Sequence, residues 1–321
     1  MSRYPFRECV NKVVRAYSGN RAESTMEVMQ RRFNRMEREF QLLHSLGIVS
    51  TTSPKRMTVD DISAYYEYLK TKADKGSPNI SIDSIKKDLI DLDKLCSFEE
   101  NNCVSIFKKK CPALSKGQSS ARLPVFTDEE FDSIVRHSND VELTDGAMIR
   151  AYALIALYLG AGLRTVEAVN ARADQIRFGD GVATIHLTVV KGQDSYGQPR
   201  DAYIIPRFIP IIEKYLAWRR SYLEFNGRVC EYMFFSLDGF EMLSDKTIRQ
   251  IRNRAEEDLG IRFDGRKCRR SYGQYLLDHN VDLEVVSSLM GHSTTKTTEE
   301  YYARIRSHMA IRRAQKQFVL E

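Results

Sequence analysis

The chain has 321 residues, of which 42% are hydrophobic and 29% charged, and its formal net charge is +6. This length suits two domains better than one core. No segment approaches the roughly 20 consecutive apolar residues that a membrane span needs. The N-terminus lacks the apolar region of a signal peptide, so we expect a cytoplasmic protein without a membrane partner.

The charge is unevenly distributed along the chain. Residues 1–120 hold 21 Lys and Arg against 15 Asp and Glu, whereas residues 121–321 are balanced. A basic half favours an acidic partner such as DNA, because neutralised phosphates release counterions. The six cysteines form no C-x-x-C pair, and the sequence has no acidic cluster. We therefore expect reduced structural thiols and no metal site.

Residues 1–115 have the pattern of a helical bundle of about four helices. Apolar residues recur at helical spacing over residues 21–46 and 82–98, and Thr58 can cap a further helix that starts after it. The bundle ends in a basic triplet, Lys108, Lys109 and Lys110. This triplet fits either a solvated charge run or a contact to DNA phosphates.

The small, polar residues 116–123 are typical of a flexible linker, and a second domain is expected over residues 124–321. There, Thr127 caps a helix and the apolar run 151–159 predicts a buried one. Residues 182–190 alternate as a strand does, between a turn at 179–181 and a second strand at 203–205. We expect a mainly α fold with a small antiparallel β-sheet.

Five separated segments of this second domain carry candidate chemistry. Arg164 follows a glycine-rich turn and precedes Glu167, and Lys191 follows an apolar strand. Arg266, Lys267, Arg269 and Arg270 crowd four like charges into five positions, which favours an anion nearby, so Lys267 and Arg270 are also candidate DNA contacts. The last two segments contain His292, after a glycine, and Tyr301. Taken singly, each fits a structural role as a surface charge, a capping histidine or a packing tyrosine.

The ordered set resembles the tyrosine recombinase family, which includes phage integrases and Xer-type resolvases. Gly-Leu-Arg with a following acidic residue matches Arg164 and Glu167, the hairpin lysine matches Lys191, and the His-x-x-Arg box falls on Arg266 to Arg269. The Leu-Gly-His element matches Met290-Gly291-His292, and the nucleophile follows nine positions later, at Tyr301. The resemblance spans residues 124 to about 306, with a looser match to the family's helical, SAM-like core-binding domain before it.

The resemblance implies a site-specific recombinase that cleaves and rejoins DNA through a 3′-phosphotyrosyl intermediate, without metal, ATP or any other cofactor. Tyr301 would attack phosphorus, Arg164 and Arg269 would clamp its oxygens, and Lys191 would protonate the leaving oxygen. His292 would donate a hydrogen bond to the phosphate, and Glu167 would orient a basic neighbour.

Two positions depart from the family pattern. Arg266 stands where most relatives have histidine, and arginine stays protonated, so this residue would add positive potential instead of taking a proton. Tyr302 is the alternative nucleophile, because the residues after it also resemble the family's sequence.

The resemblance also implies double-stranded DNA as partner, a homotetramer on two duplexes, two domains that clamp DNA, and a place at the nucleoid. Residues 306–321 form a C-terminal segment that would dock on a neighbouring subunit or within its own chain. Two other functions stay open: a type IB topoisomerase that relaxes DNA with the same chemistry, and a DNA-binding protein on this fold without catalysis.

Overall fold

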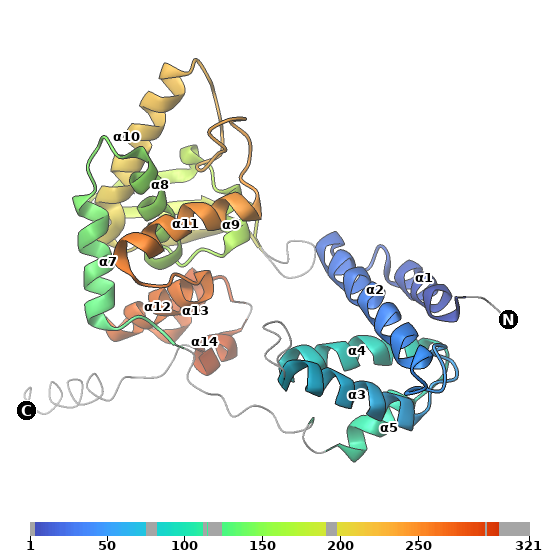
Figure 1. Cartoon of the computed structure of the whole chain (residues 1–321). Helices are drawn as coiled ribbons and strands as arrows, with labels where there is room; N and C mark the ends of the chain where they lie inside the picture. The colour runs from blue at the N-terminus through green and yellow to red at the C-terminus, as the bar shows by residue number, and fades with distance from the viewer. Residues whose placement is uncertain are drawn as a thin grey trace, which may run out of the picture. The chain divides into compact units, whose positions relative to one another are not determined.

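Figure 1 shows a computed structural model of the chain, which describes residues 4–74, 82–111, 114, 124–190, 198–292 and 294–301. The chain divides into two compact units, residues 1–119 and 120–321. The predicted linker, 116–123, lies outside the described residues. Within the described ranges, no helix combines the length and the apolar character that crossing a membrane requires.

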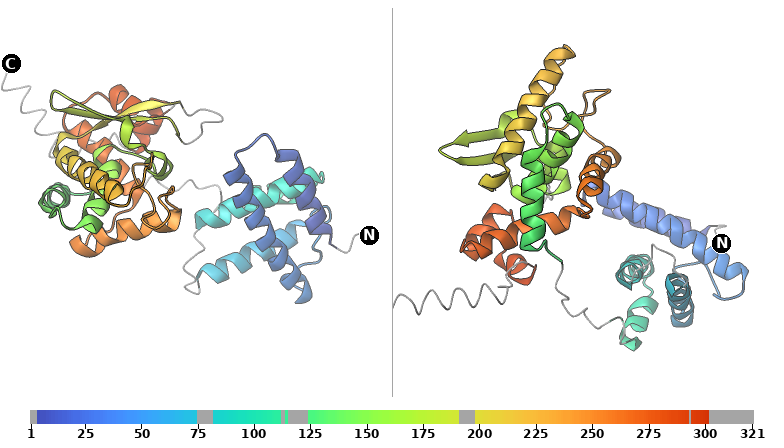
Figure 2. Two further views of the ribbon diagram at one scale, coloured as in Figure 1. Left: turned by 90° about the horizontal axis from the view of Figure 1, so that it is seen from above. Right: turned by 60° about the vertical axis from the view of Figure 1, so that its left-hand side comes forward.

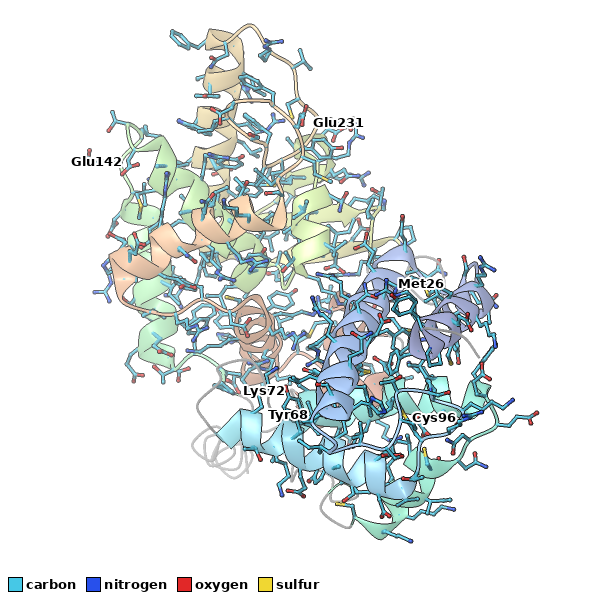
Figure 3. All side chains as sticks on the ribbon, turned by 45° about the vertical axis from the view of Figure 1, so that its right-hand side comes forward. Met26, Tyr68, Lys72, Cys96, Glu142 and Glu231 are labelled. Carbon is cyan, nitrogen blue, oxygen red and sulfur yellow. The ribbon has the colours of Figure 1, made fainter. Side chains whose placement is uncertain are left out.

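The described residues of the first unit form five main α-helices, against the four or so that the sequence predicts. They are α1 (Pro5–Tyr17), α2 (Glu23–Ser45), α3 (Val59–Asp74), α4 (Ile82–Phe98) and α5 (Cys103–Lys110). Figure 3 shows their side chains, among them Tyr68 and Cys96. The predicted cap of α3 is present. The Thr58 hydroxyl accepts a hydrogen bond from the backbone N–H of Asp61, and the Asp61 carboxylate accepts one from the backbone N–H of Thr58.

The second unit is a set of helices around one buried helix, with a small sheet at one side (Figures 1 and 2). Its helices are α7 (Asp128–Asp140), α8 (Gly146–Ile155), α9 (Thr165–Asn170), α10 (Ile209–Phe225), α11 (Asp245–Leu259), α12 (Gly265–Asp278), α13 (Leu283–Leu289) and α14 (Thr295–Tyr301). Short turns of other helix types are η1 (Ala156–Gly160), η2 (Ala173–Gln175) and η3 (Pro206–Phe208).

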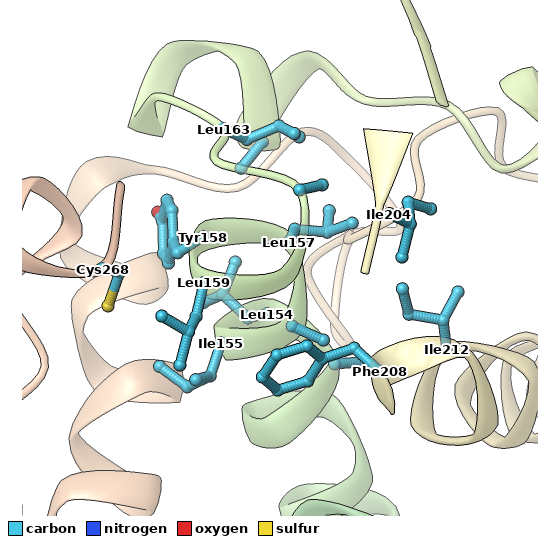
Figure 4. Close-up of a cluster of buried hydrophobic side chains, with 14 of the residues drawn as sticks. Leu154, Ile155, Leu157, Tyr158, Leu159, Leu163, Ile204, Phe208, Ile212 and Cys268 are labelled. Atoms are coloured by element: carbon cyan, nitrogen blue, oxygen red, sulfur yellow. The ribbon is translucent and has the colours of Figure 1, made fainter. Parts of the chain in front are cut away.

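The buried helix is α8 with its continuation η1, as the apolar run predicts. From Ala151 to Leu159 no side chain is more than 2% exposed. Figure 4 shows Leu154, Leu157 and Leu159 in a cluster that Phe208 and Cys268 also enter from neighbouring elements. An element buried on all sides fixes its two ends precisely, because its neighbours leave no room for a shift.

The sheet has the antiparallel order β1-β2-β3, formed by β1 (Ile176–Gly179), β2 (Val182–Leu187) and β3 (Arg200–Ile204). Asp180 and Gly181 both have positive φ, as the tight turn between two twisted strands requires. In β3 the alternation buries Ala202 and Ile204 on one face, and Arg200 shares that face. The expected mainly α fold with a small antiparallel sheet is confirmed.

Gly160 tests how tightly the end of η1 packs. A Cβ at this position would lie 2.6 Å from Cδ2 of Phe208, whereas one at Gly179 would meet no atom within 4 Å. We expect Gly160→Ala to lower the free energy of unfolding of the second unit by roughly 1–3 kcal/mol, because the buried ring has nowhere to go. Gly179→Ala is the matched control in urea denaturation, and equal midpoints for both variants and the parent would contradict this packing.

Candidate active site

The site begins at the glycine-rich turn between η1 and α9. Gly162 has a φ of +63°, and a Cβ there would lie 2.4 Å from the Tyr272 ring, so only glycine fits. The turn places Arg164 at the N-cap of α9 and Glu167 in its first helical turn. The carbonyl of Gly162 itself accepts a hydrogen bond from Arg269 of α12. The turn thus connects two of the predicted site residues directly.

The carboxylate of Glu167 is fully buried and is shared by three arginines. Its Oε1 accepts from Nη1 of Arg164 at 2.8 Å, and its Oε2 from Nη2 of Arg200 at 2.9 Å. Nη1 of Arg269 lies 3.7 Å from Oε2. Burial alone would raise the pKa of Glu167, but the charges of these arginines hold it below its ordinary value. Glu167 therefore carries its negative charge at neutral pH.

The same three arginines meet the C-terminal end of α13. Three consecutive carbonyls there, those of Leu289, Met290 and Gly291, accept hydrogen bonds from Arg200, Arg269 and Arg164 respectively. The last carbonyls of a helix have no partner within the helix and carry partial negative charge. Guanidinium groups supply both the missing hydrogen-bond donors and a positive charge, so the helix end and Glu167 together fix the position of each arginine.

The turn after α13 explains why a glycine precedes His292. The N–H of His292 donates to the carbonyl of Ser287 and that of Gly291 to Ser288, with Gly291 at a φ of +60°. A Cβ on Gly291 would also lie 2.6 Å from Cδ of Arg200. This C-capping turn sends His292 back towards the arginines.

His292 lies half-buried beside the arginine cluster. Its Nδ1 is 2.7 Å from Oγ1 of Thr298 in α14. Burial, followed by the charges of Arg269, Arg164 and Arg200, lowers the pKa of His292 to about 3. The ring is therefore neutral at physiological pH and has a single N–H to donate.

Arg200 was missed by the sequence analysis. It lies in no recognisable motif, and only the alternation of β3 places it on the buried face. Its side chain is 9% exposed, and in the structure it contacts both Glu167 and the end of α13. The strand period of two, extended back from Ile204 through Ala202 to Arg200, is the signal that would have found it.

Other predicted residues lie apart from this cluster or have protein partners. Arg266 lies exposed in the first turn of α12. Lys267 pairs with Glu130 at 3.5 Å and lies 3.9 Å above the centre of the Phe126 ring.

Arg270 is buried, and its Nε donates to the carbonyl of Pro124. This hydrogen bond connects α12 to the segment before α7.

Lys108, Lys109 and Lys110 belong to the first unit, at the end of α5. Lys108 pairs with Asp93 at 2.8 Å, whereas Lys109 and Lys110 are exposed. Tyr301 is the last residue of α14, and its side chain lies outside what the structure describes. The same holds for the whole of Lys191 and Tyr302, and for the segment 306–321.

The arrangement concentrates positive charge in a partly buried site. Arg164, Arg200 and Arg269 face a single carboxylate, so the cluster carries two more positive than negative charges. Arg164 is the most accessible of the three, with a quarter of its side chain exposed. Guanidinium groups match the geometry of phosphate oxygens, so the cluster fits a phosphate. Among the described residues, no group of three His, Cys, Asp or Glu side chains is placed to hold a metal ion.

A family model described as the phage integrase family matches residues 124–308. The chain belongs to this family. All of the segments that resemble tyrosine recombinases, from Arg164 to Tyr301, lie within the matched range, and the expected family is confirmed.

Relatives and solved structures agree with this assignment. The tyrosine recombinase XerA of Pyrococcus furiosus is 27% identical over 192 residues, which cover 59% of this chain and 60% of that protein. Matches to two further Xer recombinases cover 54% and 49% of their lengths.

The fold resembles that of a XerH site-specific recombinase bound to its difH substrate, with a TM-score of 0.65 and 17% identity over 96% of this chain and 83% of that one. A lambda integrase dimer on a core site gives a TM-score of 0.61 and 15% identity over 94% and 79% of the two chains.

The pKa of His292 predicts how the protein responds to acid. A free imidazole takes up a proton near pH 6.5, whereas the folded ring does so only at about 3. Between these values the unfolded chain binds the extra proton, so acidification through this window destabilises the fold, and the effect is absent above it. We expect the NMR signals of the His292 ring in DNA-free protein to stay constant from pH 8 to pH 5. An inflection near pH 6.5 at His292 would contradict the cationic surround of the ring.

Proposed function

We propose that this protein is a site-specific DNA recombinase that cleaves and rejoins DNA through a covalent 3′-phosphotyrosyl bond. One observation carries the proposal: three arginines share a single buried carboxylate beside a neutral histidine, which leaves an excess of positive charge. Such a surplus is costly unless an anion completes it. The names of the relatives, tyrosine recombinases, support the same activity.

In the proposed reaction, the Tyr301 hydroxyl attacks phosphorus and displaces the 5′-oxygen of the next nucleotide. A phenol has a pKa near 10, and a cationic surround favours its ionised form. Arg164 and Arg269 bind the non-bridging oxygens, on which charge builds in the transition state. Removing one such donor costs on the order of 3 kcal/mol, or about 100-fold in rate.

The remaining steps use the residues around this clamp. Lys191 protonates the leaving oxygen as general acid. His292 donates a hydrogen bond from its neutral ring, and Arg266 adds positive potential without taking a proton. Glu167 holds Arg164 and Arg269 in place, and Arg200 in turn pairs with Glu167 and with the carbonyl of Leu289. The covalent phosphotyrosyl bond conserves the energy of the broken ester, so a strand hydroxyl can reverse the step.

The proposal extends to partners and assembly. Double-stranded DNA is the substrate, and association with the nucleoid follows from it. Exchange between two duplexes breaks four strands, so it needs four active sites and thus a homotetramer. Lys109 and Lys110, exposed in the first unit, are proposed contacts to the DNA backbone.

The nucleophile can be identified by covalent trapping. We expect nicked duplexes of randomised sequence to form protein–DNA adducts that survive denaturing electrophoresis. The short fragment between the cleavage site and the nick diffuses away with the 5′-hydroxyl, so rejoining fails. Tyr301→Phe should abolish these adducts, since it removes the attacking oxygen, while Tyr302→Phe should keep them.

The reverse pattern would move the nucleophile to Tyr302, and adducts that persist in both variants would end the catalytic proposal. Sequencing the trapped DNA gives the target site. Relaxation of supercoiled plasmid by monomers, without site preference, would instead indicate a topoisomerase.

A further inference from the structure

Thr298 contacts His292 from the helix that carries the proposed nucleophile. Its side chain is fully buried, and its Oγ1 lies 2.7 Å from Nδ1 of His292. Thr298 lies three residues, nearly one helical turn, before Tyr301 in α14. The helix α14 packs on α13, and His292 lies in the turn that follows α13. A polar side chain in such a position is stable only if its hydrogen bond is made.

The contact bears on which ring nitrogen of His292 holds the proton. The three arginines keep the ring neutral, so it has one N–H and one lone pair. A hydroxyl can either donate or accept, and its choice at Nδ1 decides what Nε2 offers to the site. A bound phosphate needs a donor. If Thr298 donates to Nδ1, the proton resides on Nε2, the tautomer that can donate to a phosphate oxygen.

We propose that Thr298 is a positioning residue that holds the His292 ring with its proton on Nε2, so that seating of α14 completes the phosphate site. This inference rests on the proposed function. It makes one helix responsible for two parts of the chemistry: Tyr301 at its end and the orientation of His292 through Thr298.

The tautomer can be measured without DNA. In protein labelled with ¹⁵N-histidine, we expect the His292 signals, assigned by their loss in His292→Asn, to show the proton predominantly on Nε2. Thr298→Val, which keeps the shape and removes the hydroxyl, should shift the proton towards Nδ1, and Thr298→Ser should restore it. The exposed Thr295→Val is the matched control on the same helix. A proton on Nδ1 in the parent, or an unchanged tautomer in Thr298→Val, would overturn the inference.

A kinetic readout separates positioning from mere folding. On the trapping substrate, we expect Thr298→Val to slow adduct formation about tenfold with unchanged DNA affinity, as loss of one hydrogen bond made in the transition state does. Thr298→Ser and Thr295→Val should cleave at nearly the parent rate.

Equal rates in Thr298→Val and the parent would refute the inference while leaving the proposed function intact. If the parent forms no adduct at all, the proposed function fails, and the tautomer measurement still decides whether Thr298 sets the His292 proton. Should Thr298→Val not fold, the parent's tautomer and the rate of Thr298→Ser still test the inference.

Discussion

The site depends on one set of contacts: the hydrogen bonds and ion pairs that hold three arginines against Glu167 and the end of α13. Like charges packed together repel one another, and burial strengthens that repulsion. Here the buried carboxylate and three consecutive helix carbonyls offset part of it and give each guanidinium fixed partners. The compensation is incomplete, and the remaining positive charge suits a phosphate. Preorganised donors of this kind need not rearrange when charge develops on a reacting group.

The rest of the fold brings distant segments to this point. Arg164 comes from the turn after the buried η1, Arg200 from the first residue of β3, and Arg269 from α12. The glycines at 162 and 291 let backbone approach where a side chain would collide with Tyr272 or Arg200. Thr298 then attaches α14 to the cluster through His292. Residues from distant parts of the second unit thus lie together at one site.

Much of this arrangement could be predicted from the sequence, and the reasons for the exceptions are physical. Helix periodicity, caps and an apolar run predicted α2, α3, α4, α7 and α8, because those signals are local. The ordered motifs indicated Arg164, Glu167, Arg269 and His292, which the structure brings together. The alternation of β3 could have indicated that Arg200 is buried, but its pairing with Glu167 and the role of the carbonyls at the end of α13 depend on contacts between distant elements, which no local pattern encodes. The hydrogen bond from Arg270 to the carbonyl of Pro124 could not be predicted for a similar reason, because it joins two segments that are distant in the sequence.

The most direct measurement of the central claim is a crystal structure of the protein with the duplex that it cleaves. The account predicts that Arg164 and Arg269 contact the non-bridging oxygens of one phosphate while Glu167 still pairs with Arg164 and Arg200. A phosphate bound away from these side chains, or a Glu167 carboxylate turned out of the cluster in the complex, would contradict it.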